Sequence, residues 1–352
     1  MTLGTELHAW APWRYHGAMI ASLVLCCTGL VSAPAEGESC LLVAHPVAGR
    51  TAKIVREVHV SLTPAGATQV IAGVETKLDK ETARSRNVSE REVWEERTLA
   101  VAQVDGATRS VHTSRRFLEL ERTTARGTGA DVRQKSVASP LLGRLAYAKQ
   151  LEDGAWDRAF ERAAEWDLRC LASLDAQPPL GDWLPARSVQ AGDSWELEPA
   201  VIERAFRLDV RELLMPLPKG SEYVPPPPSD VPWRAAKWSG SASVSSIDDK
   251  KVLIALRLVG DGVWTAAAKP ATVTVEEEGA RMTFGSMEPI EETLTTTLKG
   301  ELVYDRKLGC CTSLQLKGEL RCSTSNALGE KDRLIRREQG SFVVKVNVAA
   351  DT

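Results

Sequence analysis

Histidines and clustered carboxylates are the residues of this 352-residue sequence whose side chains could do acid–base or metal chemistry. Beyond the N-terminal apolar segment the histidines are His45, His59 and His112, and no two of them have the helical spacing of a zinc-binding pair. The sequence also lacks a Cys-x-x-Cys pair. We therefore interpret each histidine as an ordinary strand or loop residue and predict no metal site.

Acidic residues cluster at Glu95-Glu96, at Glu276-Glu277-Glu278 and at Glu288, Glu291 and Glu292. Neighbouring residues of a strand point to opposite faces, so adjacent acids make poor catalytic pairs. Asp193 follows Gly192 and precedes a strand that begins near Trp195, which is typical of an aspartate that accepts hydrogen bonds from turn amides. No nucleophile elbow, Walker loop or dinucleotide fingerprint occurs.

From these absences we predict no enzyme activity, no cofactor and no catalytic residue, and the ligand-binding residues stay unassigned. The composition agrees with an ordinary globular protein: 43% of residues are hydrophobic, 26% are charged and the net charge is −3. The basic residues Arg109, Arg115, Arg116, Arg122 and Arg126 are interleaved with acids. We interpret them as a solvated strand face and expect no nucleic-acid partner.

Strands are the elements that must position these side chains. Apolar and polar residues alternate over 293–304, Asp305–Gly309 turns the chain, and the alternation resumes over 314–321. Similar patterns predict strands over 51–62, 68–78, 92–104, 108–121, 144–150, 155–160, 235–246, 251–259, 263–275, 280–284, 290–304, 310–323 and 341–348. The prediction is a mainly β (β-rich α+β) fold, with one large curved antiparallel sheet or open half-barrel of long hairpins.

One or two helices are expected to pack on this sheet. Apolar residues at three- and four-residue spacing predict a helix near 158–175, although 155–160 also fits a hairpin arm. A second helix is predicted over 199–214, because proline suits the first helical turn. A proline-rich loop should follow over 216–232. The hairpin 92–121 is polar on both faces, so we expect it to project or to lie at a sheet edge.

The N-terminus resembles an export signal. Residues 18–30 form an apolar stretch of signal-peptide length, followed by small residues that favour cleavage after Ala35. Only one arginine, Arg14, precedes the stretch, which leaves an uncleaved anchor as the alternative. The predicted organisation is a signal peptide at 1–35, a spacer at 36–50 and a single antiparallel β domain at 51–352. We expect a periplasmic or extracellular protein with no stable membrane span after cleavage.

Five cysteines follow the predicted cleavage site: Cys40, Cys170, Cys310, Cys311 and Cys322. An odd number leaves at least one thiol unpaired or paired between chains. Cys310 and Cys322 cannot bridge if they begin and end one strand, because roughly 3.3 Å per residue separates them far beyond disulfide reach.

Turn and core motifs recur along the chain: Trp94-Glu95-Glu96-Arg97, Val104-Asp105-Gly106, Ser139-Pro140-Leu141-Leu142-Gly143, Gly192-Asp193-Ser194-Trp195 and Gly300-Glu301-Leu302-Val303-Tyr304-Asp305. This set resembles uncharacterised exported β-rich proteins of planctomycete-type bacteria. The layout is also similar to lipoprotein-carrier-like proteins, in which a curved sheet wraps helices around an apolar cavity. The latter resemblance implies a cavity of that kind and no catalytic residues.

Two functions are the main hypotheses. The first is a non-enzymatic exported protein that binds an apolar ligand, a lipid or an envelope component between the sheet and the helix 158–174. The second is a structural or protein-interaction protein of the cell envelope with a solid core. An enzyme is a third possibility, which would need polar residues that converge in a cleft.

Overall fold

The computed structural model describes residues 38–78, 85–104, 107–128, 131–162, 165–171, 180–206, 216, 218–220, 236–266, 273–277, 280–284, 290–327 and 332–351. Residues 38–352 form one compact unit. The predicted signal peptide and most of the predicted proline-rich loop lie outside the described residues.

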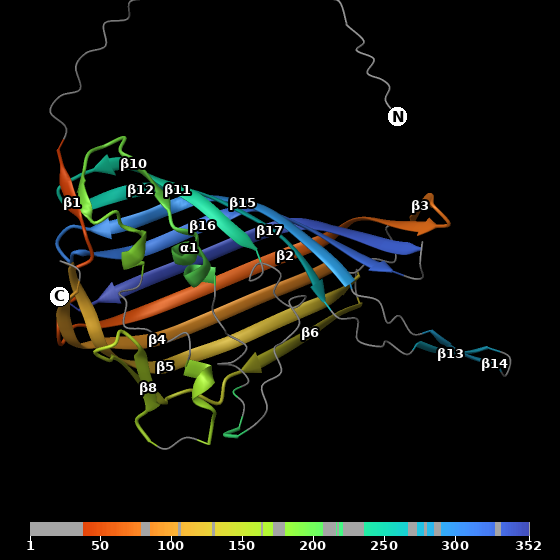
Figure 1. Cartoon of the computed structure of the whole chain (residues 1–352), viewed down its shortest axis with the longest axis horizontal. Helices are drawn as coiled ribbons and strands as arrows, with labels where there is room; N and C mark the ends of the chain where they lie inside the picture. Colours follow the sequence, from red (N-terminus) through yellow and green to blue (C-terminus); the bar gives the residue numbers. More distant parts are fainter. Residues whose placement is uncertain are drawn as a thin grey trace, which may run out of the picture. The chain divides into compact units, whose positions relative to one another are not determined.

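The described part of the chain is dominated by one antiparallel sheet of thirteen strands (Figure 1). Its hydrogen-bonded path runs through β10 (Ser194–Leu197), β11 (Lys237–Ile247), β12 (Lys251–Ala266), β15 (Ile290–Asp305), β16 (Cys310–Ala327), β17 (Arg333–Ala350), β2 (Thr51–Ile71), β4 (Ser85–Val104), β5 (Ala107–Thr128), β7 (Leu145–Gln150) and β8 (Trp156–Phe160). Two further strands, β3 (Val74–Leu78) and β6 (Asp131–Ala138), pair with β2 and β5. The path has two ends, β10 and β8, and the prediction of a large open antiparallel sheet is confirmed.

Two small pairs of strands and three helical elements make up the remaining regular structure of the described residues. The pairs are β1 (Cys40–Leu42) with β9 (Arg187–Val189), and β13 (Val273–Glu277) with β14 (Ala280–Phe284). The helical elements are the 3-10 turns η2 (Leu168–Leu171) and η3 (Gly181–Trp183) and the α-helix α1 (Pro199–Phe206). No described helix has the length and hydropathy to cross a membrane.

The strict alternation along the strands gives the sheet an inner, buried face and an outer, solvated face. On neighbouring strands Leu302, Leu314 and Val346 lie opposite one another and face inward. The residues directly before and after each of them along its strand are exposed or half-buried. Several strands are much longer than the usual five or six residues; β5, for example, has 22. Such strands must bend to keep one face buried.

Glycines on the inner face permit that bending. A Cβ added at Gly300 would lie 1.7 Å from the carbonyl oxygen of Gln315, and one at Gly340 would lie 1.6 Å from that of Ser61. Only a residue without a Cβ allows the neighbouring backbone this close.

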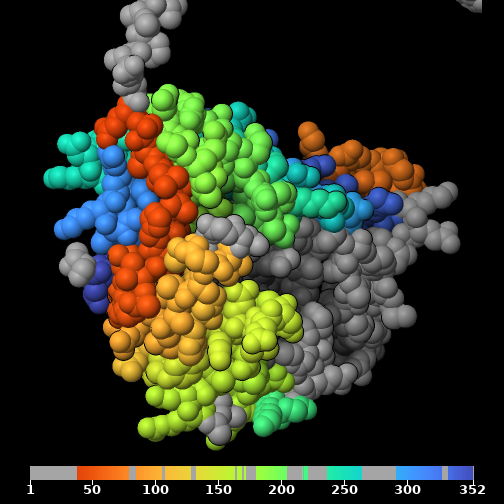
Figure 2. Space-filling view, turned by 60° about the vertical axis from the view of Figure 1, so that its left-hand side comes forward, coloured from red at the N-terminus to blue at the C-terminus, as the bar shows by residue number. Residues whose placement is uncertain are grey.

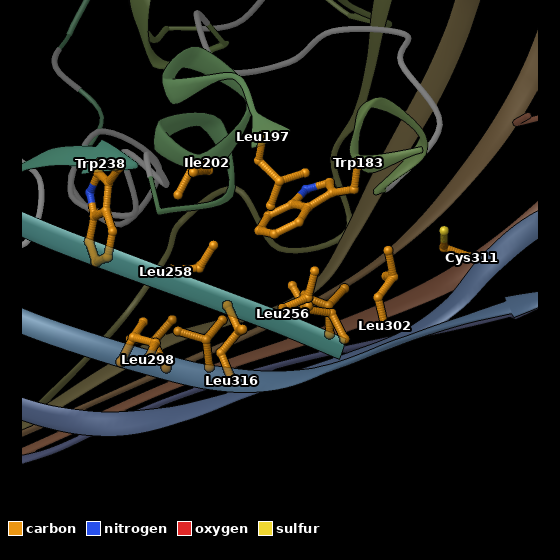
Figure 3. Close-up of a cluster of buried hydrophobic side chains, with 14 of the residues drawn as sticks. Trp183, Leu197, Ile202, Trp238, Leu256, Leu258, Leu298, Leu302, Cys311 and Leu316 are labelled. Atoms are coloured by element: carbon orange, nitrogen blue, oxygen red, sulfur yellow. The ribbon is translucent and has the colours of Figure 1, made fainter. Parts of the chain in front are cut away.

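One end of the inner face is covered by η3, α1 and the β1–β9 pair. Figure 3 shows Trp183, Leu197 and Ile202 pointing down onto leucines of the sheet. Ile202 and Leu258 are fully buried, and Trp183 is 3% exposed. The helix and the sheet therefore fill one another here, and each fully buried large side chain stabilises the fold by roughly 1.5–3 kcal/mol.

The predicted helix near 158–175 is wrong in the part the structure describes. Residues 156–160 form β8, which pairs with β7, and only the short turn η2 is helical further on. The apolar residues of this segment fit both the helical period and the two-residue period of a strand. The strand forms because its pairing with β7 buries Ala146 and Ala148 completely. The second helix begins at Pro199 as predicted and reaches Phe206; residues 207–214 lie outside the described part.

Other boundaries also differ from the predictions. Residues 63–66 do not turn but continue β2 through a bulge, and the reversal comes at Ala72-Gly73. Residues 123–136, which lie between two predicted strands, mostly belong to strands themselves, β5 and β6. The spacer 36–50 contains β1, whose Leu42 is fully buried. The hairpin 92–121 is neither projecting nor at an edge: β4 and β5 lie between β2 and β7.

Candidate functional site: the charged part of the inner sheet face

The histidines considered in the sequence do not come together. His59 lies on β2, where its Nδ1 is 2.9 Å from Ser89 Oγ, and His112 lies on β5 near the ring of Tyr147. His45 packs against Gly309 at a turn. Across the described ranges, no three His, Cys, Asp or Glu side chains are placed to hold a metal ion.

Asp193 is a turn residue, as the sequence predicted. Its Oδ2 accepts a hydrogen bond of 2.9 Å from the amide of Gln190. Glu95 and Glu96 point to opposite faces, with Glu95 exposed and Glu96 buried. The side chains of Glu276–Glu278 and Glu288 lie outside the described residues, and Glu291 and Glu292 lie on β15.

Charged side chains occupy the inner face on β2, β4 and β5. The register places Arg56 opposite Glu92, and Glu90 opposite Arg122. Glu90 is 3% exposed, and its Oε1 lies 3.6 Å from Nε of Arg122. We call Arg56, Glu90, Glu92 and Arg122 the ionic rows. Buried charges of this kind are stable only when they are paired.

Another buried ion pair lies further along the same face. Arg115 Nη2 donates to Glu96 Oε2 at 2.6 Å, and its guanidinium stacks 4.8 Å from the centroid of the Trp94 ring. The ring nitrogen of Trp94 donates to the same carboxylate oxygen at 3.4 Å. The interpretation of the basic cluster as a solvated face is therefore wrong for Arg115 and Arg122.

Beyond the ionic rows, at the end of the sheet away from α1, the inner face opens into a cleft of about 600 Å³. The arginines that line it are Arg86, Arg126, Arg336 and Arg337, against one acid, Glu338. Its apolar lining includes Leu78 and Leu334. We call this the arginine cleft.

The arginines enter the cleft from three strands. Arg86 on β4 is opposite Arg126 on β5 and Leu62 on β2. Arg86 Nη2 donates to Glu338 on β17 at 3.1 Å, and both side chains are mostly buried. Positive charge is therefore concentrated at the end of the inner face where β17, β2, β4 and β5 lie side by side.

A second cleft, of about 480 Å³, lies at the covered end of the sheet. Its lining joins Thr108 and Arg109, near the tip of the β4–β5 hairpin, to η3, β10 and α1. Figure 2 shows β1 and the segment that begins with η3 lying together at this end. Its charged lining is Arg109, Asp182, Glu196 and Glu198, so this cleft is mainly acidic.

Burial changes the ionisation of several groups near the inner face. It raises the pKa of Tyr304 to about 12, although the hydroxyl donates to the carbonyl of Val43 at 3.0 Å. It also raises the pKa of the Cys322 thiol to about 12, against the opposing effect of Arg86. The cysteines of the described residues are all unbridged.

Sequence reasoning missed the arginine cleft and the ionic rows. Arg86 and Glu338 are 252 positions apart in the sequence, and they meet only because β17 pairs with β2. One local signal was available in the hairpin 92–121. Acidic residues of one arm and basic residues of the other lie at equal distances from the turn, so they are expected to be opposite each other in the paired strands.

No protein-family model matches the chain, and no curated protein matches it. Among solved structures it is similar to a Pseudomonas aeruginosa FadL homologue, with a TM-score of 0.19 and 8% identity over 85% of this chain and 90% of that chain. An outer membrane channel from Pseudomonas putida F1 gives 0.17 and 9%, over 87% and 98% of the two chains. The toluene transporter TodX of P. putida gives 0.14 and 8%, over 86% and 90%. Likenesses at these scores carry no argument about function, so the function must be inferred from the chain's own geometry.

Proposed function

We propose that this chain is an exported, non-enzymatic protein that binds an apolar ligand on the inner face of its sheet, with the arginine cleft as the entrance. The observation that carries the proposal is the position of the cleft next to the buried apolar layer of the sheet. Leu320 and Phe342 belong to the apolar layer of β12–β17, and the cleft begins four residues further along the same strands at Thr324 and Glu338. Pockets for small ligands combine an apolar wall with a few polar groups in this way.

The location differs from the one the sequence suggested. The helix expected at 158–174 is absent from its described part, and α1 packs directly on the sheet. The cleft that remains at the covered end has mainly acidic charged residues in its lining. The arginine cleft lies at the other end. Export is supported by the apolar stretch at 18–30.

A structural or protein-interaction role with a solid core is the second candidate. The complete burial of Ile202, Leu258 and Leu316 at the covered end favours it. The two candidates differ in what they predict for the arginine cleft, which a purely structural protein does not need to keep open.

The test is native mass spectrometry of residues 36–352 purified from the host, with solvent extraction of any bound compound. We expect a stoichiometric apolar adduct and uptake of a fluorescent fatty acid. The variant Ala67→Trp, which fills the arginine cleft, should abolish uptake. Ser61→Trp places the same ring on the exposed outer face of β2 and is the matched control. A clean mass with no uptake would favour the structural candidate.

A further inference from the structure

We propose that the arginine cleft binds the anionic head group of an amphipathic ligand, a carboxylate or a phosphate at the end of an apolar chain. This inference rests on the proposed function for the apolar part of the ligand. The head-group site has its own support, which is the excess of positive charge in one cleft: among the described lining residues there are four arginines and one glutamate.

The arginines differ in how they are placed. Arg86 is fixed by its 3.1 Å ion pair with Glu338, and Arg337 Nη1 donates to Thr68 Oγ1 at 3.0 Å. Arg126, Arg336 and Arg337 are all exposed to solvent at the cleft. Arg126 and Arg336 lie opposite Arg86 and Thr324, which line the cleft, whereas Arg337 lies opposite Ser323, which does not. We therefore assign ligand contact to Arg126 and Arg336, and regard Arg86 as a positioning residue that keeps Glu338 away from the anion.

Glu338 does not cancel the charge of the cleft. Its carboxylate pairs with Arg86, and arginines outnumber it in the described lining, which therefore keeps a net positive charge. The thiol of Cys322, opposite Glu338 on β16, stays neutral because burial raises its pKa. An anion that enters the cleft meets this positive charge on partly desolvated walls, where charge interactions are stronger than in bulk water.

Guanidinium groups suit oxyanions with two or more equivalent oxygens. Each presents parallel N–H donors that match a carboxylate or a phosphate, which a lysine ammonium does not. The apolar chain attached to such a head group would extend from the cleft over Leu334 and Leu78, the apolar residues of its wall. A neutral apolar molecule of equal length would gain only the contacts with Leu334 and Leu78.

Isothermal titration calorimetry with four probes tests the assignment: dodecanoate, dodecyl phosphate, dodecanol and inorganic phosphate. The variants are Arg126→Gln and Arg336→Gln, with Arg336→Lys to separate charge from fork geometry. Arg321→Gln is the matched control, because Arg321 is an arginine on the outer face near the same end of the sheet. Since the substituted arginines are exposed, thermal melts of all variants should match that of the native chain.

We expect both C12 anions to bind and dodecanol to bind at least about tenfold more weakly. Each glutamine variant at the cleft should weaken anion binding by about tenfold to a hundredfold, the range for a lost hydrogen bond to a charged group. Arg336→Lys should recover part of that loss, and Arg321→Gln should change nothing. The tighter of the two anions identifies the head group as carboxylate or phosphate.

The remaining outcomes separate this inference from the proposed function. Equal affinities for dodecanol and the anions, unchanged in the arginine variants, overturn the head-group site and leave apolar binding intact. Arginine-dependent binding of inorganic phosphate, with no gain from a C12 chain, supports the anion site and overturns the apolar ligand. If none of the four probes binds, both are overturned.

Discussion

Glu90→Gln should destabilise the fold far more than the loss of a surface ion pair does. Glu90 Oε1 and Arg122 Nε are 3.6 Å apart, and the side chains are 3% and 13% exposed. At an effective dielectric constant of about 20, opposite charges at this separation attract by about 5 kcal/mol, in line with the roughly 3–5 kcal/mol lost when one member of a buried pair is removed. We therefore expect the free energy of unfolding to fall by about 3 kcal/mol or more.

The assay is urea unfolding of a double-mutant cycle with Glu90→Gln, Arg122→Met and the combined variant. If the two charges stabilise each other, the combined variant should be more stable than the sum of the two single effects predicts, by a coupling free energy of about 1–3 kcal/mol. The internal control is the cycle for Arg321 and Glu319, whose atoms are 3.5 Å apart but whose side chains are 71% and 80% exposed. That pair should contribute less than about 1 kcal/mol.

The comparison isolates burial, because the two pairs have almost the same separation. Additive effects at Glu90 and Arg122, each below about 1 kcal/mol, would refute the reasoning, since they would place both charges in water. A loss at the exposed pair as large as at the buried pair would refute it as well.

Three further predictions concern packing and ionisation. Gly318→Ala should lower the free energy of unfolding by about 3 kcal/mol or more, measured by urea denaturation, because its Cβ would lie 1.8 Å from the carbonyl oxygen of Thr297. Trp183→Ala should cost about 3–5 kcal/mol in the same assay, since it empties the space between η3 and the sheet. The pKa of Tyr304, about 10 in the unfolded chain, is about 12 when folded. The contribution of neutral Tyr304 to the free energy of unfolding, up to about 3 kcal/mol, is therefore complete below pH 10 and lost between about pH 10 and 12. When the free energy of unfolding is measured against pH, Tyr304→Phe should lose less stability over this range than the native chain.

Much of the sheet could be predicted from the sequence because its strands follow a strict two-residue period. The hairpin of β15 and β16 has the predicted turn at residues 305–309, and Leu298, Leu302 and Leu314 are buried as their alternation required. The hairpin of β7 and β8 was also predicted. Prolines and glycines were weaker guides, since Pro64 and Gly66 lie within β2 at a bulge rather than in a turn.

The charged part of the inner face could not be predicted, because no single strand contains the information. Residues 88–96 carry glutamates at positions 90, 92 and 96 that look like solvent-facing residues in isolation. Glu90 and Glu96 are buried opposite arginines of β5, Arg122 and Arg115. Glu92 is buried opposite Arg56 of β2. The register between strands, and the bulge at Val93/Trp94, decide which acids point inward.

The position of the ionic rows favours the ligand-binding proposal over the structural one. Replacing a buried ion pair by apolar residues of similar volume is often neutral or stabilising, so a solid core gains nothing from charges at Arg56 or Glu90. The β12–β17 half of the same face is lined mainly by leucine and valine. The charges occur on the strands that lead into the arginine cleft, where Arg122 precedes Arg126 by four residues on β5. A ligand whose head group binds the cleft arginines and whose apolar chain lies on Leu334 and Leu78 suits this division, and a filled core does not need it.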